Sequence, residues 1–171
     1  MLTVGTLSHS IDVPTVNIDA MATDLLLACL HHLVVFSLVT IPAVELALMR
    51  GQVGAPRIAH LARLDAAYGL LAMAILAIGF GRVFWGAKDS VFYLHNPVFW
   101  AKLAFFALAG FASAAPTVRI LRWKKAVARD AGFAVAKPDV ASTRRWLTAE
   151  LMLFVPIPLL AAAMARAVGL G

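Results

Sequence analysis

The chain has 171 residues, of which 62% are hydrophobic and 14% are charged, and its formal net charge is +6. A soluble domain has about 45–50% apolar and about 25% charged residues, so this chain lacks the polar side chains that a water-exposed surface requires. Its length allows one domain. The basic residues lie between apolar segments and form no stripe with aromatic residues, which excludes a nucleic-acid-binding domain. Cys29 is the only cysteine, so an intrachain disulfide is excluded.

Four apolar segments follow one another along the chain. We expect membrane-spanning helices at about residues 24–49, 64–85, 97–118 and 146–165. The uncharged parts of the last three are shorter than the ~20 residues of a typical span. Four such segments in series, in so apolar a chain, nevertheless predict an all-α membrane protein. The expected architecture is a four-transmembrane-helix bundle over residues 23–171, preceded by a tail over residues 1–22.

Local signals mark some of the helix ends. The third segment is expected to begin at Asn96 and Pro97, because asparagine caps helices and proline fits the first helical turn. Residues 126–142 are expected to form a long loop, since Gly132 and Pro138 interrupt helices.

The distribution of positive charge predicts the orientation of the bundle. Most of the 15 lysine and arginine residues lie in residues 50–63 and 119–145, and the N-terminal tail has none. Because cytoplasmic loops are enriched in these residues, both basic loops are expected in the cytoplasm and both termini outside it. The protein is then a multi-pass protein of a bacterial inner (plasma) membrane, surrounded by the lipid bilayer.

Ionisable residues inside spans mark candidate functional sites, and a first group lies toward the outer side. It consists of His31, His32, Arg82, His95 and Lys102. Such a cationic pocket would suit an anionic ligand with an apolar body, such as haem b or a porphyrin, with His31 or His32 on the iron and cations on the propionates. The alternative is that these residues bind no ligand. Lys102 and Arg82 are near enough to the interface to snorkel, and the adjacent histidines point about 100° apart on a helix.

A second group of ionisable residues lies toward the cytoplasmic side. The acidic members are Glu45, Asp65 and Glu150, with Tyr68 beside them, and arginines such as Arg63 and Arg119 are within reach. The simplest interpretation is a set of interhelical ion pairs that lock this end of the bundle. The alternative is proton transfer, with Glu45 as a relay into the outer pocket.

Five strings of the sequence resemble an uncharacterised bacterial membrane family known by a domain-of-unknown-function label. They are LHHLVVFSLVTIPAVEL, ARLDAAYGLLA, YLHNPVFWAKLAFFAL, PTVRILRW and AELMLFVPI. The resemblance covers the chain from about residue 22 onward. It implies the four-span fold and a membrane location, without an established activity.

The four-span layout also has a distant resemblance to HemJ-type protoporphyrinogen oxidases and to CopD-like copper-resistance membrane proteins. Those families have an early histidine in the first helix, which matches His31 or His32, and the HemJ type opens its third helix with a string like WAKL at residues 100–103. The resemblance implies a histidine haem ligand and places the lysine of that string near the tetrapyrrole. The chain departs from the HemJ type at Glu45, where that family has an arginine, and at residues 111–113, where its later histidine has no counterpart.

Two functions from different classes follow from these observations. The first is a membrane protein that binds haem b or a porphyrin in the outer half of the bundle for redox chemistry. The second is a non-enzymatic accessory or assembly subunit, acting as a homo-oligomer or with a membrane-complex partner. Whether the protein is an enzyme is left open at this point.

Overall fold

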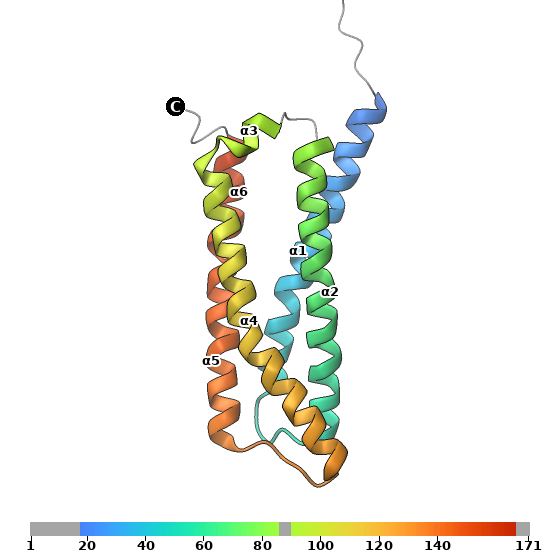
Figure 1. Cartoon of the computed structure of the whole chain (residues 1–171), viewed down its shortest axis with the longest axis vertical. Coiled ribbons are helices and arrows are strands. Elements are labelled where there is room, and N and C mark those ends of the chain that lie inside the picture. Colours follow the sequence, from blue (N-terminus) through green and yellow to red (C-terminus); the bar gives the residue numbers. More distant parts are fainter. Residues whose placement is uncertain (1–17, 86–89, 167–171) are drawn as a thin grey trace, which may run out of the picture.

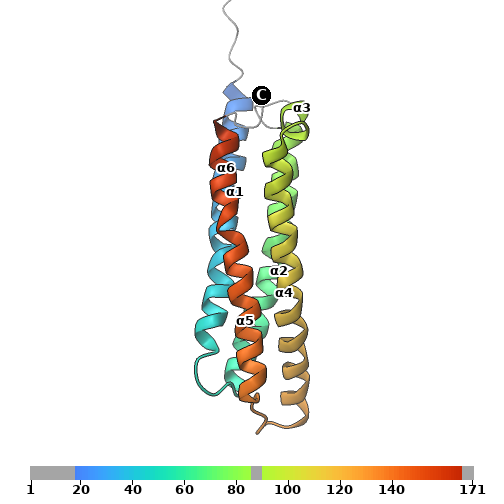
Figure 2. The same cartoon turned by 90° about the vertical axis from the view of Figure 1, so that its left-hand side faces the viewer.

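The computed structural model describes residues 18–85 and 90–166. The helices are α1 (Ile18–Leu48), α2 (Ala55–Trp85), α3 (Ser90–Leu94), α4 (Pro97–Arg129), α5 (Lys137–Phe154) and α6 (Pro156–Ala165). In Figures 1 and 2, α6 continues α5 as one rod, and α1, α2 and α4 form the other three. The described ends of α1 and α6 lie at one end of the bundle, together with α3. The end that holds the α1–α2 and α4–α5 loops is called the basic end below, and the other the opposite end.

The four rods are long and apolar enough to cross a membrane. The candidate spans are Met21–Leu48, Ala55–Gly81, Pro97–Arg129 and Lys137–Met164. This confirms the predicted all-α four-helix membrane bundle. The side of the membrane on which the termini lie stays a prediction from the charge distribution.

Helix ends follow the local chemistry of the sequence. The Asn96 side chain accepts a hydrogen bond of 2.8 Å from the backbone N–H of Val98, and Pro97 occupies the first turn, so the predicted cap of α4 is confirmed. The break between α5 and α6 falls at Val155, immediately before Pro156, because proline has no N–H to continue the α5 hydrogen-bond ladder.

The helices on the basic side are longer than the apolar segments. Helix α2 begins at Ala55, α4 continues to Arg129 and α5 begins at Lys137. The predicted loop over residues 126–142 is therefore wrong in extent, because only residues 130–136 separate α4 from α5. Most charged residues of these extensions are exposed, whereas Arg119 and Arg144 bond to neighbouring helices. Apolar residues on the inward faces form a separate core that stabilises the extra turns.

This basic-end core lies between the two loops and the helix extensions. Its buried members are Met49, Val53, Ile58, Leu61, Ile120, Trp123, Val135, Val140 and Leu147. The two loops are also joined directly, because the backbone N–H of Val135 donates to the carbonyl of Val53 at 2.9 Å and Gly54 pairs with Ala134 in an isolated antiparallel bridge.

A second core fills the middle of the bundle. Its buried members are Leu38, Ile41, Tyr68, Ile75, Ala109 and Phe154. Helix α1 packs against α2 and α5, and α4 packs against α2, α5 and α6. Helix α4 runs obliquely, beside α6 toward the opposite end and close to α2 toward the basic end (Figure 1). The described backbones of α1 and α4 are not adjacent, so these helices occupy diagonal positions.

Candidate functional site

The two adjacent histidines of α1 face in different directions. His31 packs toward α2, because its Cε1 atom lies 3.9 Å from the position that a Cβ atom on Gly79 would occupy, and its Nδ1 atom is buried. His32 is exposed, and its Nδ1 atom lies 2.7 Å from the carbonyl oxygen of Ala28 on the same helix. Their ring planes are 79° apart. Of the two, His31 is the one that faces a neighbouring helix.

The structure describes the surroundings of two other residues expected in the outer pocket, His95 and Lys102. His95 is exposed, with Nδ1 3.1 Å from the carbonyl oxygen of Val91. The Nζ atom of Lys102 lies 5.7 Å from the centre of the Phe99 ring on its own helix. The side chain of Arg82 lies outside the described part of the structure. Within the described side chains, a tetrapyrrole would therefore find one inward-facing imidazole, that of His31.

The carboxyl groups near the basic end do come together. Glu45 of α1 is 3% exposed and Glu150 of α5 is 1% exposed, and Asp65 of α2 is half-buried. Asp65 and Glu150 are both close enough to Glu45 to repel its charge. These three residues, from three helices, are called the carboxyl cluster below.

Two of these carboxyl groups are incompletely satisfied. Glu45 and Glu150 each have a buried oxygen, Oε1, for which the described residues provide no hydrogen-bond donor. A buried polar group without a partner costs about 1–3 kcal/mol in proteins, and an ionised one costs more. Such groups are rare in native structures, and their position inside candidate membrane spans makes this cluster the leading functional site.

Hydroxyl groups line the cluster on the remaining side. Thr117 of α4 donates a hydrogen bond of 2.6 Å to Asp65. The buried Tyr68 side chain lies near the Glu150 carboxyl and Ser113. Ser113 and Thr117 were not singled out in the sequence, although they are four residues apart and therefore share one face of α4. This spacing of two hydroxyl residues in an otherwise apolar segment is the sequence pattern that could have indicated their part in the site.

The arginines have partners other than the carboxyl cluster. Arg119 donates to the hydroxyls of Ser142 at 2.9 Å and Thr143 at 3.3 Å. Arg144 donates to the main-chain carbonyl of Leu46 at 2.9 Å, in the last turn of α1. Arg63 is exposed. Arg119 therefore binds hydroxyls of α5 where the sequence suggested a carboxylate. The ion pairs expected of Arg63 and Arg119 with acidic residues stay a prediction.

The cluster gathers groups that exchange protons readily. Carboxyl and phenol groups are proton donors and acceptors, and hydroxyls pass hydrogen bonds between them. Among the described residues, no group of three or more His, Cys, Asp and Glu side chains converges tightly enough to hold a metal ion. The arrangement therefore suits the binding and exchange of protons.

The fold and this site define a four-span, all-α membrane protein with titratable groups buried between its helices. The chain belongs to the family described as predicted membrane protein (DUF2214), which it matches over residues 23–169. The resemblance to an uncharacterised membrane family is thereby confirmed. Comparisons with curated proteins and with solved structures gave no match.

Proposed function

We propose that this protein transfers protons through the membrane and that the carboxyl cluster is its proton-binding station. The observation that carries the proposal is the pair of buried Oε1 atoms of Glu45 and Glu150, which have no hydrogen-bond donor among the described residues. An acidic side chain inside a membrane helix is costly, by about 2.5–3.5 kcal/mol at the helix centre and by less toward the end, where Glu45 lies. A bundle that only needed to pack would be more stable with apolar residues at these two positions.

The surroundings of the cluster support a route from the basic end. Asp65 is half-buried and lies nearest in sequence to the charged extension of α2, so it is the expected entry point. Glu45 and Glu150 are more deeply buried, and Tyr68 and Thr117 supply hydroxyls between the helices. Like-charged carboxyl groups in one site favour a state in which they hold protons between them.

An apolar barrier separates the cluster from the opposite half. His31 lies 14 residues before Glu45 on α1, which corresponds to about 21 Å along the helix. Leu38 and Ile41 of the central core occupy this interval. Proton passage to His31 therefore requires water to enter the central core, and this core is the gate of the proposed path.

Proton flux into proteoliposomes tests the proposal. The protein is reconstituted in vesicles that contain a pH-sensitive dye, and a potassium diffusion potential drives proton entry. Glu45→Gln and Glu150→Gln remove a titratable group with little change in shape, and both are expected to reduce the flux at least tenfold. Asp139→Asn is the matched control, because Asp139 is exposed in the first turn of α5. Wild-type flux no greater than that of empty vesicles, or full flux in both Gln variants, would refute the proposal.

A second candidate function is the binding of haem b or a porphyrin at His31. The observation that favours it is the direction of His31, which faces α2 with a buried Nδ1 atom, whereas His32 bonds to its own helix. A bound haem would supply one-electron redox chemistry. Purified protein is then expected to show a Soret band that His31→Ala abolishes and His32→Ala retains. A colourless protein that takes up no added haemin contradicts this candidate.

A further inference from the structure

A groove opens at the basic end, away from the carboxyl cluster. It has a volume of about 1170 Å³ and lies between the loop after α1 and the first half of α5. Its walls are formed by residues 49–52 on one side and residues from 137 to 148 on the other, with residues 134–136 beneath. The proton-transfer proposal does not involve any residue of this groove.

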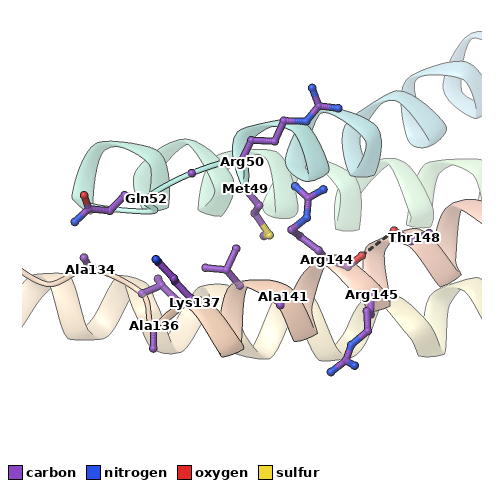
Figure 3. A pocket seen from close by; sticks show the side chains of 13 residues that line it. Met49, Arg50, Gln52, Ala134, Ala136, Lys137, Ala141, Arg144, Arg145 and Thr148 are labelled. Atoms are coloured by element: carbon purple, nitrogen blue, oxygen red, sulfur yellow. Dashed lines mark hydrogen bonds between the residues drawn. The ribbon is translucent and has the colours of Figure 1, made fainter.

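The lining of the groove combines cations with an apolar floor. The cations are Arg50, Lys137, Arg144 and Arg145, and the part of the chain that the structure describes places no aspartate or glutamate in its lining. Figure 3 shows Lys137 and Arg144 extending from α5 toward the α1–α2 loop, while Arg50 and Arg145 point outward on either side. The Arg144 guanidinium is fixed by its 2.9 Å hydrogen bond to the carbonyl of Leu46. An anionic group is therefore the complementary occupant.

The groove is continuous with the membrane-facing surface of α5. Ala141 and Thr148 line the groove, and Met152 and Val155 follow Thr148 at spacings of four and seven residues. Residues at these spacings share one face of a helix. Met152 is 63% exposed and Val155 is 57% exposed, so this face becomes apolar as it enters the span. A ligand with an anionic head and long apolar chains matches both parts of the surface.

We propose that this groove is a binding site for an anionic phospholipid of the adjacent leaflet, with the headgroup phosphate between Lys137 and Arg144 and an acyl chain along the exposed face of α5. Lysine and arginine both donate hydrogen bonds to phosphate oxygens, and arginine does so with a planar, two-pronged group. Beneath this position, Ala134 and Ala136 supply an apolar surface for the glycerol region. The site lies where a headgroup is expected, at the boundary between the apolar part of α5 and its charged extension.

Displacement of a fluorescent phosphatidylglycerol from the detergent-purified full chain tests this site. Unlabelled dioleoylphosphatidylglycerol is expected to displace the probe, and dioleoylphosphatidylcholine and inorganic phosphate are not. Lys137→Gln is expected to weaken binding roughly fivefold, which corresponds to about 1 kcal/mol per cation near a membrane surface. The matched control is Lys124→Gln, because Lys124 is an exposed cation of α4 at the same end but outside the groove.

A variant without a charge change separates the groove from the general positive charge of this end. Ala141→Phe places a ring on the groove wall between Lys137 and Arg144, and it is expected to weaken binding at least fivefold. Ala128→Phe on the exposed surface of α4 is its control and is expected to leave binding unchanged. The proposal is overturned if phosphatidylcholine competes as well as phosphatidylglycerol, if inorganic phosphate displaces the probe equally, or if the groove variants match their controls. Melting curves of each variant verify that it is folded.

Discussion

Replacement of Glu45 by methionine is expected to stabilise the protein while it removes the proposed proton-transfer function. Glu45 is 3% exposed, its Oε1 atom has no donor among the described residues, and Asp65 and Glu150 both repel its charge. Methionine has a similar length, no charge and no need for a hydrogen bond. The change therefore removes an unfavourable group and leaves no cavity.

The size of the expected stabilisation follows from the free-energy cost of the buried Glu45 oxygen that has no hydrogen-bond donor. Removal of a buried polar atom without a partner recovers about 1–3 kcal/mol of the unfolding free energy. For a protein of this length, 1 kcal/mol corresponds to about 2–4 °C in the melting temperature. Glu45→Met is thus expected to raise the melting temperature by at least about 2 °C in a fixed detergent. Asp139→Asn removes an exposed carboxyl in the first turn of α5 and is expected to lower the melting temperature slightly, by the equivalent of at most about 1 kcal/mol, and not to raise it.

The opposite result would refute this reasoning. A fall in the melting temperature of Glu45→Met would mean that Glu45 has a favourable partner in the membrane, as an ion pair with an arginine would provide. Breaking a buried ion pair costs about 3–5 kcal/mol. The two interpretations of Glu45 therefore predict changes in unfolding free energy of opposite sign and different size. The measurement therefore decides between a structural ion pair and a group retained for its chemistry.

Three further substitutions test individual contacts by thermal unfolding in the same detergent. Thr117→Val removes the 2.6 Å hydrogen bond to Asp65 and should cost about 1.5–3 kcal/mol of unfolding free energy. Thr117→Ser keeps the hydroxyl and should retain most of the stability. Equal losses in the two variants would show that the hydroxyl contributes nothing. Asn96→Ala removes the cap of α4 and should cost about 1 kcal/mol, a loss that Asn96→Ser should partly avoid because serine caps helices without adding a charge. Ala109→Leu overpacks the central core and should cost about 1–3 kcal/mol, while Ala104→Leu on the exposed face should be neutral.

The sequence was sufficient to predict the features that depend on hydropathy and local chemistry. The four spans follow from apolar length, and the start of α4 follows from the capping chemistry of Asn96 and Pro97. The sequence did not predict how far α2, α4 and α5 extend at the basic end. Charged residues are equally compatible with a water-exposed helix and with a loop, and only the packing of residues such as Ile58 and Trp123 decides in favour of helix.

The site was predictable in its members but not in its geometry. Glu45, Asp65 and Glu150 stand out as acidic residues inside apolar segments. Their partners depend on how each helix is rotated about its axis, and a membrane helix is apolar on its lipid face as well as its core face, so hydrophobic periodicity fixes this rotation poorly. For the same reason the sequence left open whether His31 or His32 faces a neighbour, and it did not indicate that Arg119 binds hydroxyls of α5.

The link between the two basic-end loops has a mechanical consequence. Helices α1 and α2 form one hairpin, and α4 with α5 and α6 forms another. The Val135–Val53 hydrogen bond and the Gly54–Ala134 bridge tie the two hairpins at their turns. Any rotation of one hairpin against the other is therefore most restricted at this tie. A rotation of about 5° about the tie would displace the far ends of the hairpins by about 3 Å across the ~30 Å hydrocarbon layer, so a small change at the basic end would have its largest effect at the opposite end.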